Sequence, residues 1–154
     1  MTASNHMLTG AAIAVIVRQP LLAIPLAVAS HYLLDFMPHF GIEEEEVEEK
    51  GKSRLFWTVF AVDVALLILW LVLLPHLLHG HIAPWIVWTT MVAAYIPDAV
   101  WLYRFAYRQA TGRYKQRSKL TQFHADIQHE YVWGIVVEAV WCSALLGGLM
   151  AVAR

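Results

Sequence analysis

Three long apolar runs constrain the fold of this chain more than any other feature of its sequence. They cover residues 55–78, 81–103 and 131–152, and each is about as long as the ~20 residues that a helix needs to cross a bilayer. Hydrophobic residues make up 59% of the 154 residues and charged residues only 15%. That balance is typical of an integral membrane protein and not of a soluble domain of this length. We therefore expect an all-α protein embedded in a membrane.

A fourth apolar region, residues 7–37, is interrupted by Arg18, Gln19 and Pro20. A proline preceded by two polar residues favours the end of one helix and the start of the next. This region is therefore expected to fold as a helical hairpin. The sequence thus predicts a single transmembrane domain over residues 1–154, a bundle of about five helices in which the hairpin precedes three longer spans.

Charged segments between the apolar runs set the expected orientation. The basic loop 104–120 should be cytoplasmic by the positive-inside rule, and it carries Arg104, Arg108, Arg113, Lys115, Arg117 and Lys119. The acidic loop 41–53 is then cytoplasmic as well, and its six glutamates predict a solvated segment. Beside a membrane, the basic loop is explained by topology and by contact with anionic lipid, and not by nucleic acid. A homo-oligomer is compatible with so small a bundle.

Ionisable side chains lie inside these apolar runs. A charged group costs roughly 2.5 to 3.5 kcal/mol at the bilayer centre by insertion scales, so such positions usually face a bundle interior and mark function. At a rise of ~1.5 Å per residue, Asp63, Asp98 and Glu138 fall roughly 10 to 15 Å in from the cytoplasmic face. Their shared depth predicts one polar site. The alternative for Asp63 and Glu138 is a structural pairing with basic residues or a hydrogen bond across helices.

The pair His31 and Asp35 is the strongest candidate for metal binding. Residues four apart project from one face of a helix, so the two side chains can hold one cation, or the aspartate can orient a ligating imidazole. Pro38 should end this helix at about Met37. His39 then lies just past the helix end, where it can fold back to the same place.

Other segments supply further ligand candidates. Asp98 follows Pro97, which bends a membrane helix and frees a backbone carbonyl that a polar neighbour must satisfy. The segment 121–134 alternates polar and apolar groups and should lie along the membrane interface, with His124 as its better ligand candidate. The expected metal ligands are His6, His31, Asp35, His39, Asp98 and His124. Imidazole and carboxylate without thiolate favour zinc or manganese, and are also compatible with iron or magnesium.

Taken together, these residues resemble the bacterial membrane-bound metal-dependent hydrolases, a family of small multi-helix inner-membrane proteins. The resemblance is carried by four short motifs: His6 followed by small residues to Gly10, the H-x-x-x-D of His31 and Asp35, Pro97-Asp98, and Phe123-His124. In that family the H-x-x-x-D element tends to follow the Pro-Asp, whereas here it precedes it. The resemblance implies metal-dependent hydrolysis at the bacterial inner membrane.

The leading functional hypothesis is a membrane-embedded, metal-dependent hydrolase of phosphoesterase or phospholipase type. Its substrate would be a lipid or lipid-linked phosphoester at the cytoplasmic leaflet, with Asp63 or Glu138 as general base or as a residue that orients a ligand. Arg104 and Arg108 are candidates for holding the phosphate. One alternative is a small transporter or channel subunit that handles protons or cations. The other is a non-catalytic membrane protein in which a metal ion joins the helices.

Overall fold

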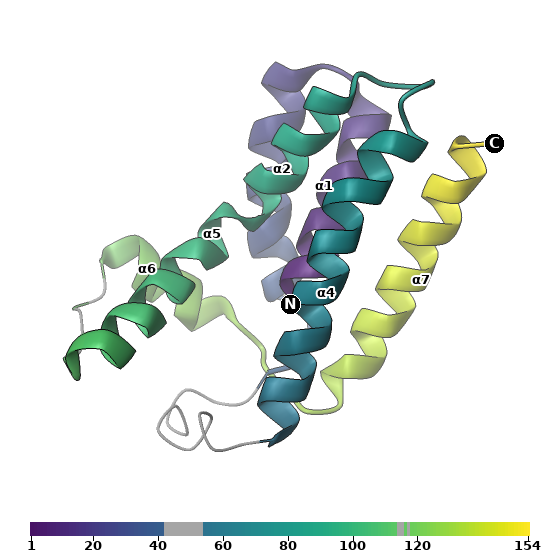
Figure 1. Cartoon of the computed structure of the whole chain (residues 1–154). Helices are drawn as coiled ribbons and strands as arrows, with labels where there is room; N and C mark the ends of the chain where they lie inside the picture. The colour runs from purple at the N-terminus through teal and green to yellow at the C-terminus, as the bar shows by residue number, and fades with distance from the viewer. Residues whose placement is uncertain (42–53, 114–115, 117) are drawn as a thin grey trace.

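The computed structural model describes residues 1–41, 54–113, 116 and 118–154, apart from the side chains of Trp101 and Gln109. Every regular element in this part of the chain is a helix (Figure 1), which confirms the all-α prediction. Three of the helices, α4, α5 and α7, are long and apolar enough to cross a membrane. The helices are α1 (Ala3–Val17), α2 (Pro20–Asp35), α4 (Arg54–Leu77), α5 (Pro84–Thr111), α6 (Lys119–Ile127) and α7 (Gly134–Val152).

The described residues form six helices, one more than the sequence predicted. The additional helix is α6, which falls in the segment expected to lie along the interface. The acidic loop 41–53 lies outside the described residues, except for Gly41.

The first two helices form the predicted hairpin. Arg18 adopts a left-handed conformation with φ of 56°, and its N–H donates to the Ala14 carbonyl at 2.9 Å, which ends α1. The side chain of Gln19 then accepts a hydrogen bond from the Leu22 N–H at 2.9 Å, and Pro20 begins α2. At its other end α2 stops at Asp35, two residues before the predicted Met37.

Helix α5 continues beyond the predicted end of its span at residue 103. No proline or glycine occurs between Asp98 and Gly112, and the helix ends only where Gly112 takes a left-handed conformation with φ of 66°. Arg104 and Arg108 therefore lie on this helix. The prediction that the whole of 104–120 is a loop is wrong for its first eight residues, which belong to α5, and for its last two, which belong to α6.

Helix α1 is the centre of the bundle. It packs against α2, α4, α5 and α7, and Figure 1 shows its N-terminal end among the other helices. A Cβ atom on Gly10 would lie 2.7 Å from the Thr90 carbonyl oxygen and 2.9 Å from Met91 Cα, so the backbones of α1 and α5 are in close contact there. Leu8 and Ala11 are fully buried beside this crossing.

The outer helices expose apolar side chains instead of polar ones. On α4, Val62 and Val72 are exposed, and on α7 the same holds for Val136 and Val140. Exposed apolar surface of this extent is typical of helices that face lipid. The bundle therefore buries polar groups near α1 and turns its apolar surface outward, as expected for a membrane protein.

Candidate metal centre

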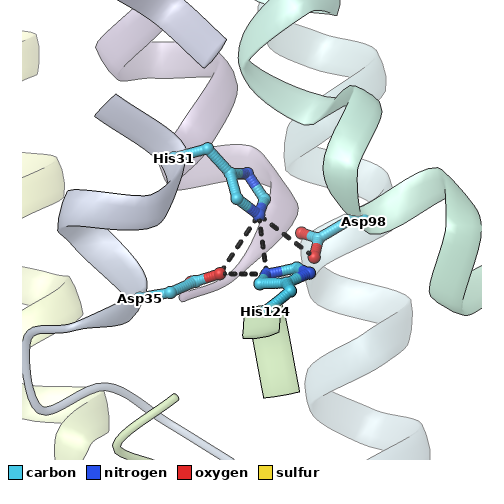
Figure 2. A group of neighbouring side chains, drawn as sticks. All are labelled: His31, Asp35, Asp98 and His124. Carbon is cyan, nitrogen blue, oxygen red and sulfur yellow. Dashed lines mark hydrogen bonds and ion pairs between the residues drawn. The ribbon is translucent and has the colours of Figure 1, made fainter. Parts of the chain in front are cut away.

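Four of the six predicted ligands meet at one place. His31 and Asp35 come from α2, Asp98 from α5 and His124 from α6, and each offers a ligand atom within 4.8 Å of the others. Figure 2 shows the four side chains pointing toward one another, and they come from three helices. The group of these four residues is called the metal cluster below.

Distances within the metal cluster are close to those between ligands that share an ion. The Oδ2 atom of Asp35 lies 2.6 Å from His124 Nε2 and 3.1 Å from His31 Nε2. The two Nε2 atoms are 3.1 Å apart, and His31 Nε2 is 3.5 Å from Asp98 Oδ1. Ligands bound tetrahedrally at ~2.0–2.1 Å from zinc are roughly 3.3 Å apart. The distances of 2.6–3.5 Å in the cluster lie on both sides of this value, and all four donor atoms fall within 4.8 Å of one another, so the cluster could hold a divalent cation.

The imidazole of His31 is held in the orientation that a metal ligand needs. Its Nδ1–H donates to the Ala94 carbonyl oxygen at 2.7 Å. A hydrogen bond at Nδ1 leaves the lone pair on Nε2, the atom that faces the metal cluster. The backbone of α5 thus fixes the tautomer of a histidine on α2.

Pro97 positions Asp98 at this same point of α5. It lies at the middle of the helix, where Figure 1 shows a bend, and a proline removes one helical hydrogen bond and bends the axis. Asp98 follows directly, and its side chain is 21% exposed, whereas those of His31 and Asp35 are fully buried. The metal cluster is therefore open on the side of Asp98.

Helix α6 brings His124 to the end of α2. Ser118 begins this helix by accepting a hydrogen bond from the Thr121 N–H at 3.2 Å. Tyr32, which the sequence analysis did not single out, packs edge-on against both His31 and His124 with ring centroids 5.6 and 5.4 Å away. Its only sequence signal is its position next to His31, which does not distinguish it from other interfacial tyrosines.

His6 adjoins the metal cluster from α1, as expected. Its ring stacks on that of His31 with centroids 3.8 Å apart and an angle of 21° between the planes. Its Nε2 lies 3.1 Å from Asp35 Oδ1 and 4.0 Å from Asp98 Oδ2. The same Oδ1 atom of Asp35 accepts a hydrogen bond from the Met1 nitrogen at 2.5 Å.

His39 lies outside the metal cluster, although it was predicted as a ligand. Its Nδ1–H donates to the Met37 carbonyl at 2.8 Å, and its backbone pairs with the segment before α7 through His129 and Tyr131. Burial lowers the pKa of the His39 imidazole. A Cβ atom on Gly134 would overlap the His39 backbone. This histidine therefore belongs to the junction between the end of α2 and the start of α7.

The two acids expected as catalytic groups, Asp63 and Glu138, contact the start of α1. Asp63 accepts hydrogen bonds from the backbone N–H groups of Ala3 at 3.1 Å and Ser4 at 2.9 Å. These N–H groups belong to the first helical turn, which has no backbone partners of its own. Asp63 therefore caps α1 from the neighbouring helix α4.

Glu138 holds the same end of α1 from α7 and is 3% exposed. Its carboxylate accepts hydrogen bonds from the Thr2 N–H at 3.2 Å, the Thr2 hydroxyl, the Asn5 amide at 3.1 Å and the Phe40 N–H at 3.0 Å. With so many donors, both oxygens are occupied. The described contacts of Asp63 and Glu138 favour the structural alternative, in which they anchor the helix that carries His6.

Arg104 and Arg108 lie on α5 six and ten residues after Asp98. At ~3.6 residues per turn, Arg104 is about 120° around the helix from Asp98. Both arginines are partly buried. The helix therefore carries them toward its C-terminal end and not into the metal cluster itself.

The metal cluster consists of hard and borderline donors in a buried place. The two carboxylates, Asp35 and Asp98, repel each other when both are ionised, and a cation between them would offset this repulsion. This donor set suits zinc or manganese, and it contains no thiolate that would favour a softer ion. Comparison with protein-family models, with curated proteins and with solved structures finds no match for this chain, so the functional argument rests on the geometry of the cluster.

Proposed function

We propose that this protein is a metal-dependent hydrolase of the bacterial inner membrane that cleaves a phosphoester in a lipid or a lipid-linked molecule at the cytoplasmic leaflet. One observation carries the proposal. Two imidazole nitrogens and two carboxylates from three helices converge, at ligand spacing, in a bundle whose longest helices could span a membrane. Ionisable groups in such a place are expensive and usually functional.

His31, His124, Asp35 and Asp98 would hold the ion, with His31 fixed by the Ala94 carbonyl. A divalent cation there would act as a Lewis acid on the phosphoryl oxygen and make water a better nucleophile. The protein supplies the fixed geometry and the exclusion of bulk water around the buried side chains of His31 and Asp35. Asp98 lies where a substrate can enter, because its carboxylate is the more exposed of the two.

A lipid phosphoester is the substrate class that fits this location. The metal cluster lies near the C-terminal end of α2, where α6 contacts this helix. From Asp98, α5 continues to its basic C-terminal end. Arginine side chains near a membrane surface attract anionic headgroups, and arginine binds phosphate with two parallel hydrogen bonds. Arg104 and Arg108 lie roughly 9 and 15 Å farther along α5 than Asp98, at ~1.5 Å per residue. They would hold anionic headgroups on the approach to the cluster, and the ester would reach Asp98.

The first experiment measures metal content in detergent-purified protein prepared without chelator. Wild type should contain tightly bound zinc or manganese, and Asp35→Asn and His124→Ala should lose it while they remain monodisperse and helical. His76→Ala is the matched control. This histidine is exposed in the last turn of α4, a helix that contributes no residue to the metal cluster. It should keep the metal content of wild type.

The second experiment measures hydrolysis of phospholipids in mixed vesicles by metal-loaded wild type and by Asp98→Asn. We expect release of phosphate or of a headgroup by wild type. Asp98→Asn should lose at least ~100-fold in activity, because even the partners of metal ligands typically contribute ~10–100-fold and Asp98 is a proposed ligand itself. Metal-free wild type, or equal turnover by Asp98→Asn, contradicts the proposal.

A further inference from the structure

We infer that the metal centre is binuclear. A second divalent cation would be held by His6 and by the carboxylate oxygens that face it, Oδ1 of Asp35 and Oδ2 of Asp98. The first position is the one in the metal cluster, and the second lies beside it on the side of α1. This inference rests on the proposed metal site and extends it by one ion and one ligand.

The two carboxylates are divided between the two positions. Asp35 directs Oδ2 at His31 and His124, and directs Oδ1 at His6, 3.1 Å from its Nε2. Asp98 is divided in the same way, because Oδ1 is 3.5 Å from His31 Nε2 and Oδ2 is 4.0 Å from His6 Nε2. A carboxylate whose two oxygens face different histidines is arranged to bridge two ions. Both Asp35 and Asp98 have this arrangement.

The stacking of His6 on His31 excludes a single ion shared by both rings. An imidazole binds a metal in the plane of its ring, and an ion at the zinc distance lies roughly 3 Å from the ring centroid. The two planes are inclined by only 21° with centroids 3.8 Å apart, so they meet on the order of 10 Å away. Each ring therefore needs an ion of its own.

The spacing of the stacked rings also fits two ions. Metal pairs that act together on phosphoesters are ≈ 3.5–4 Å apart, and the ring centroids of His6 and His31 are separated by 3.8 Å. Two ions that lie in these nearly parallel planes would have about the same separation.

The two positions differ in their number of protein ligands. The first has four donors, from His31, His124, Asp35 and Asp98. The second has three, from His6, Asp35 and Asp98, and a site with three protein ligands keeps a place for water or substrate. An ion at the second position would replace the hydrogen bond from the Met1 nitrogen to Asp35. The second position therefore keeps a free coordination place, and a phosphoester would approach it past Asp98, the more exposed of the two carboxylates.

Metal stoichiometry of the full-length protein tests the inference. Wild type, His6→Ala and His39→Gln are loaded with zinc, freed of excess ion by gel filtration in detergent, and analysed for zinc per chain. We expect two ions in wild type, one in His6→Ala and two in His39→Gln. His39 is the matched control because it is also a buried histidine, yet its described contacts are with the backbone near α7.

Manganese-loaded wild type provides a readout that does not depend on any variant folding. Two Mn²⁺ ions bridged by carboxylates couple their spins, and the electron paramagnetic resonance spectrum should show this coupling. The spectrum of His6→Ala should become that of isolated Mn²⁺. One ion per chain in wild type with an uncoupled spectrum overturns the binuclear centre and leaves the proposed function standing. No bound metal in wild type overturns both.

Discussion

Replacing Glu138 should destabilise the whole bundle, because this carboxylate joins α7 to the start of α1. It accepts hydrogen bonds from the Thr2 backbone, the Thr2 hydroxyl, the Asn5 amide and the Phe40 backbone while buried at 3% exposure. Each hydrogen bond to a charged group contributes ~1.5–3 kcal/mol, but such bonds are not additive within one network. Removing one partner of a buried charged network costs about 3–5 kcal/mol.

For a protein of this size, a loss of 1 kcal/mol lowers the melting temperature by ~2–4 °C. Glu138→Ala should therefore melt on the order of 6–20 °C below wild type, by the same conversion. Glu138→Gln keeps one acceptor oxygen, so its melting temperature should lie between those of wild type and Glu138→Ala. The measurement is thermal unfolding in detergent, followed by circular dichroism at 222 nm.

Ser143→Ala is the control for Glu138. Ser143 is exposed on the same helix, and its hydroxyl donates to the Ala139 carbonyl one turn earlier, at 2.7 Å. Its removal should leave the melting temperature nearly unchanged. A Glu138→Ala protein that melts within a degree of wild type would refute the assignment of Glu138 as an anchor of α1.

Three further predictions follow from the packing and the metal cluster. Gly10→Ala should lower the free energy of unfolding by ~1–3 kcal/mol, because the added methyl group overpacks against α5. Gly147→Ala is its control, since a Cβ there meets nothing within 4 Å. Equal melting temperatures of the two variants would contradict the close crossing of α1 and α5. Asp63→Asn should lower the free energy of unfolding by about 0.5–2 kcal/mol, because it weakens a helix cap. Thr58→Ala, at an exposed position on the same helix, should leave the stability unchanged. Chelator should lower the melting temperature of wild type, and added zinc should restore it; a melting curve that does not respond to either contradicts a bound metal.

Much of the fold could be predicted from the sequence because its signals are local. Pro20 after two polar residues marks the hairpin, and long apolar runs mark α4, α5 and α7. The end of α5 was missed because a run of charged residues was interpreted as a loop, although no residue before Gly112 stops a helix. Charge determines the side of the membrane, whereas glycine and proline determine where a helix ends.

The candidate site was predicted in part, for a similar reason. Spacing along one helix was enough to pair His31 with Asp35, and Pro97 marked Asp98. Depth in the membrane also grouped Asp63 and Glu138 with these residues, but depth does not give the direction in which a side chain points. Both acids turn toward the backbone of α1. Only the packing of helices could separate groups that bind a metal from groups that hold a helix.

The central position of α1 has a consequence for the order of assembly. His6 lies on α1, and His124 lies on α6, 118 positions later in the sequence. The metal centre therefore cannot close during synthesis of the hairpin, and it needs α5 and α6 in place before an ion is held. Until then the carboxylates of Asp35 and Asp98 have no shared partner. If the cluster holds the proposed ion, the helices would have to be packed before the ion is bound.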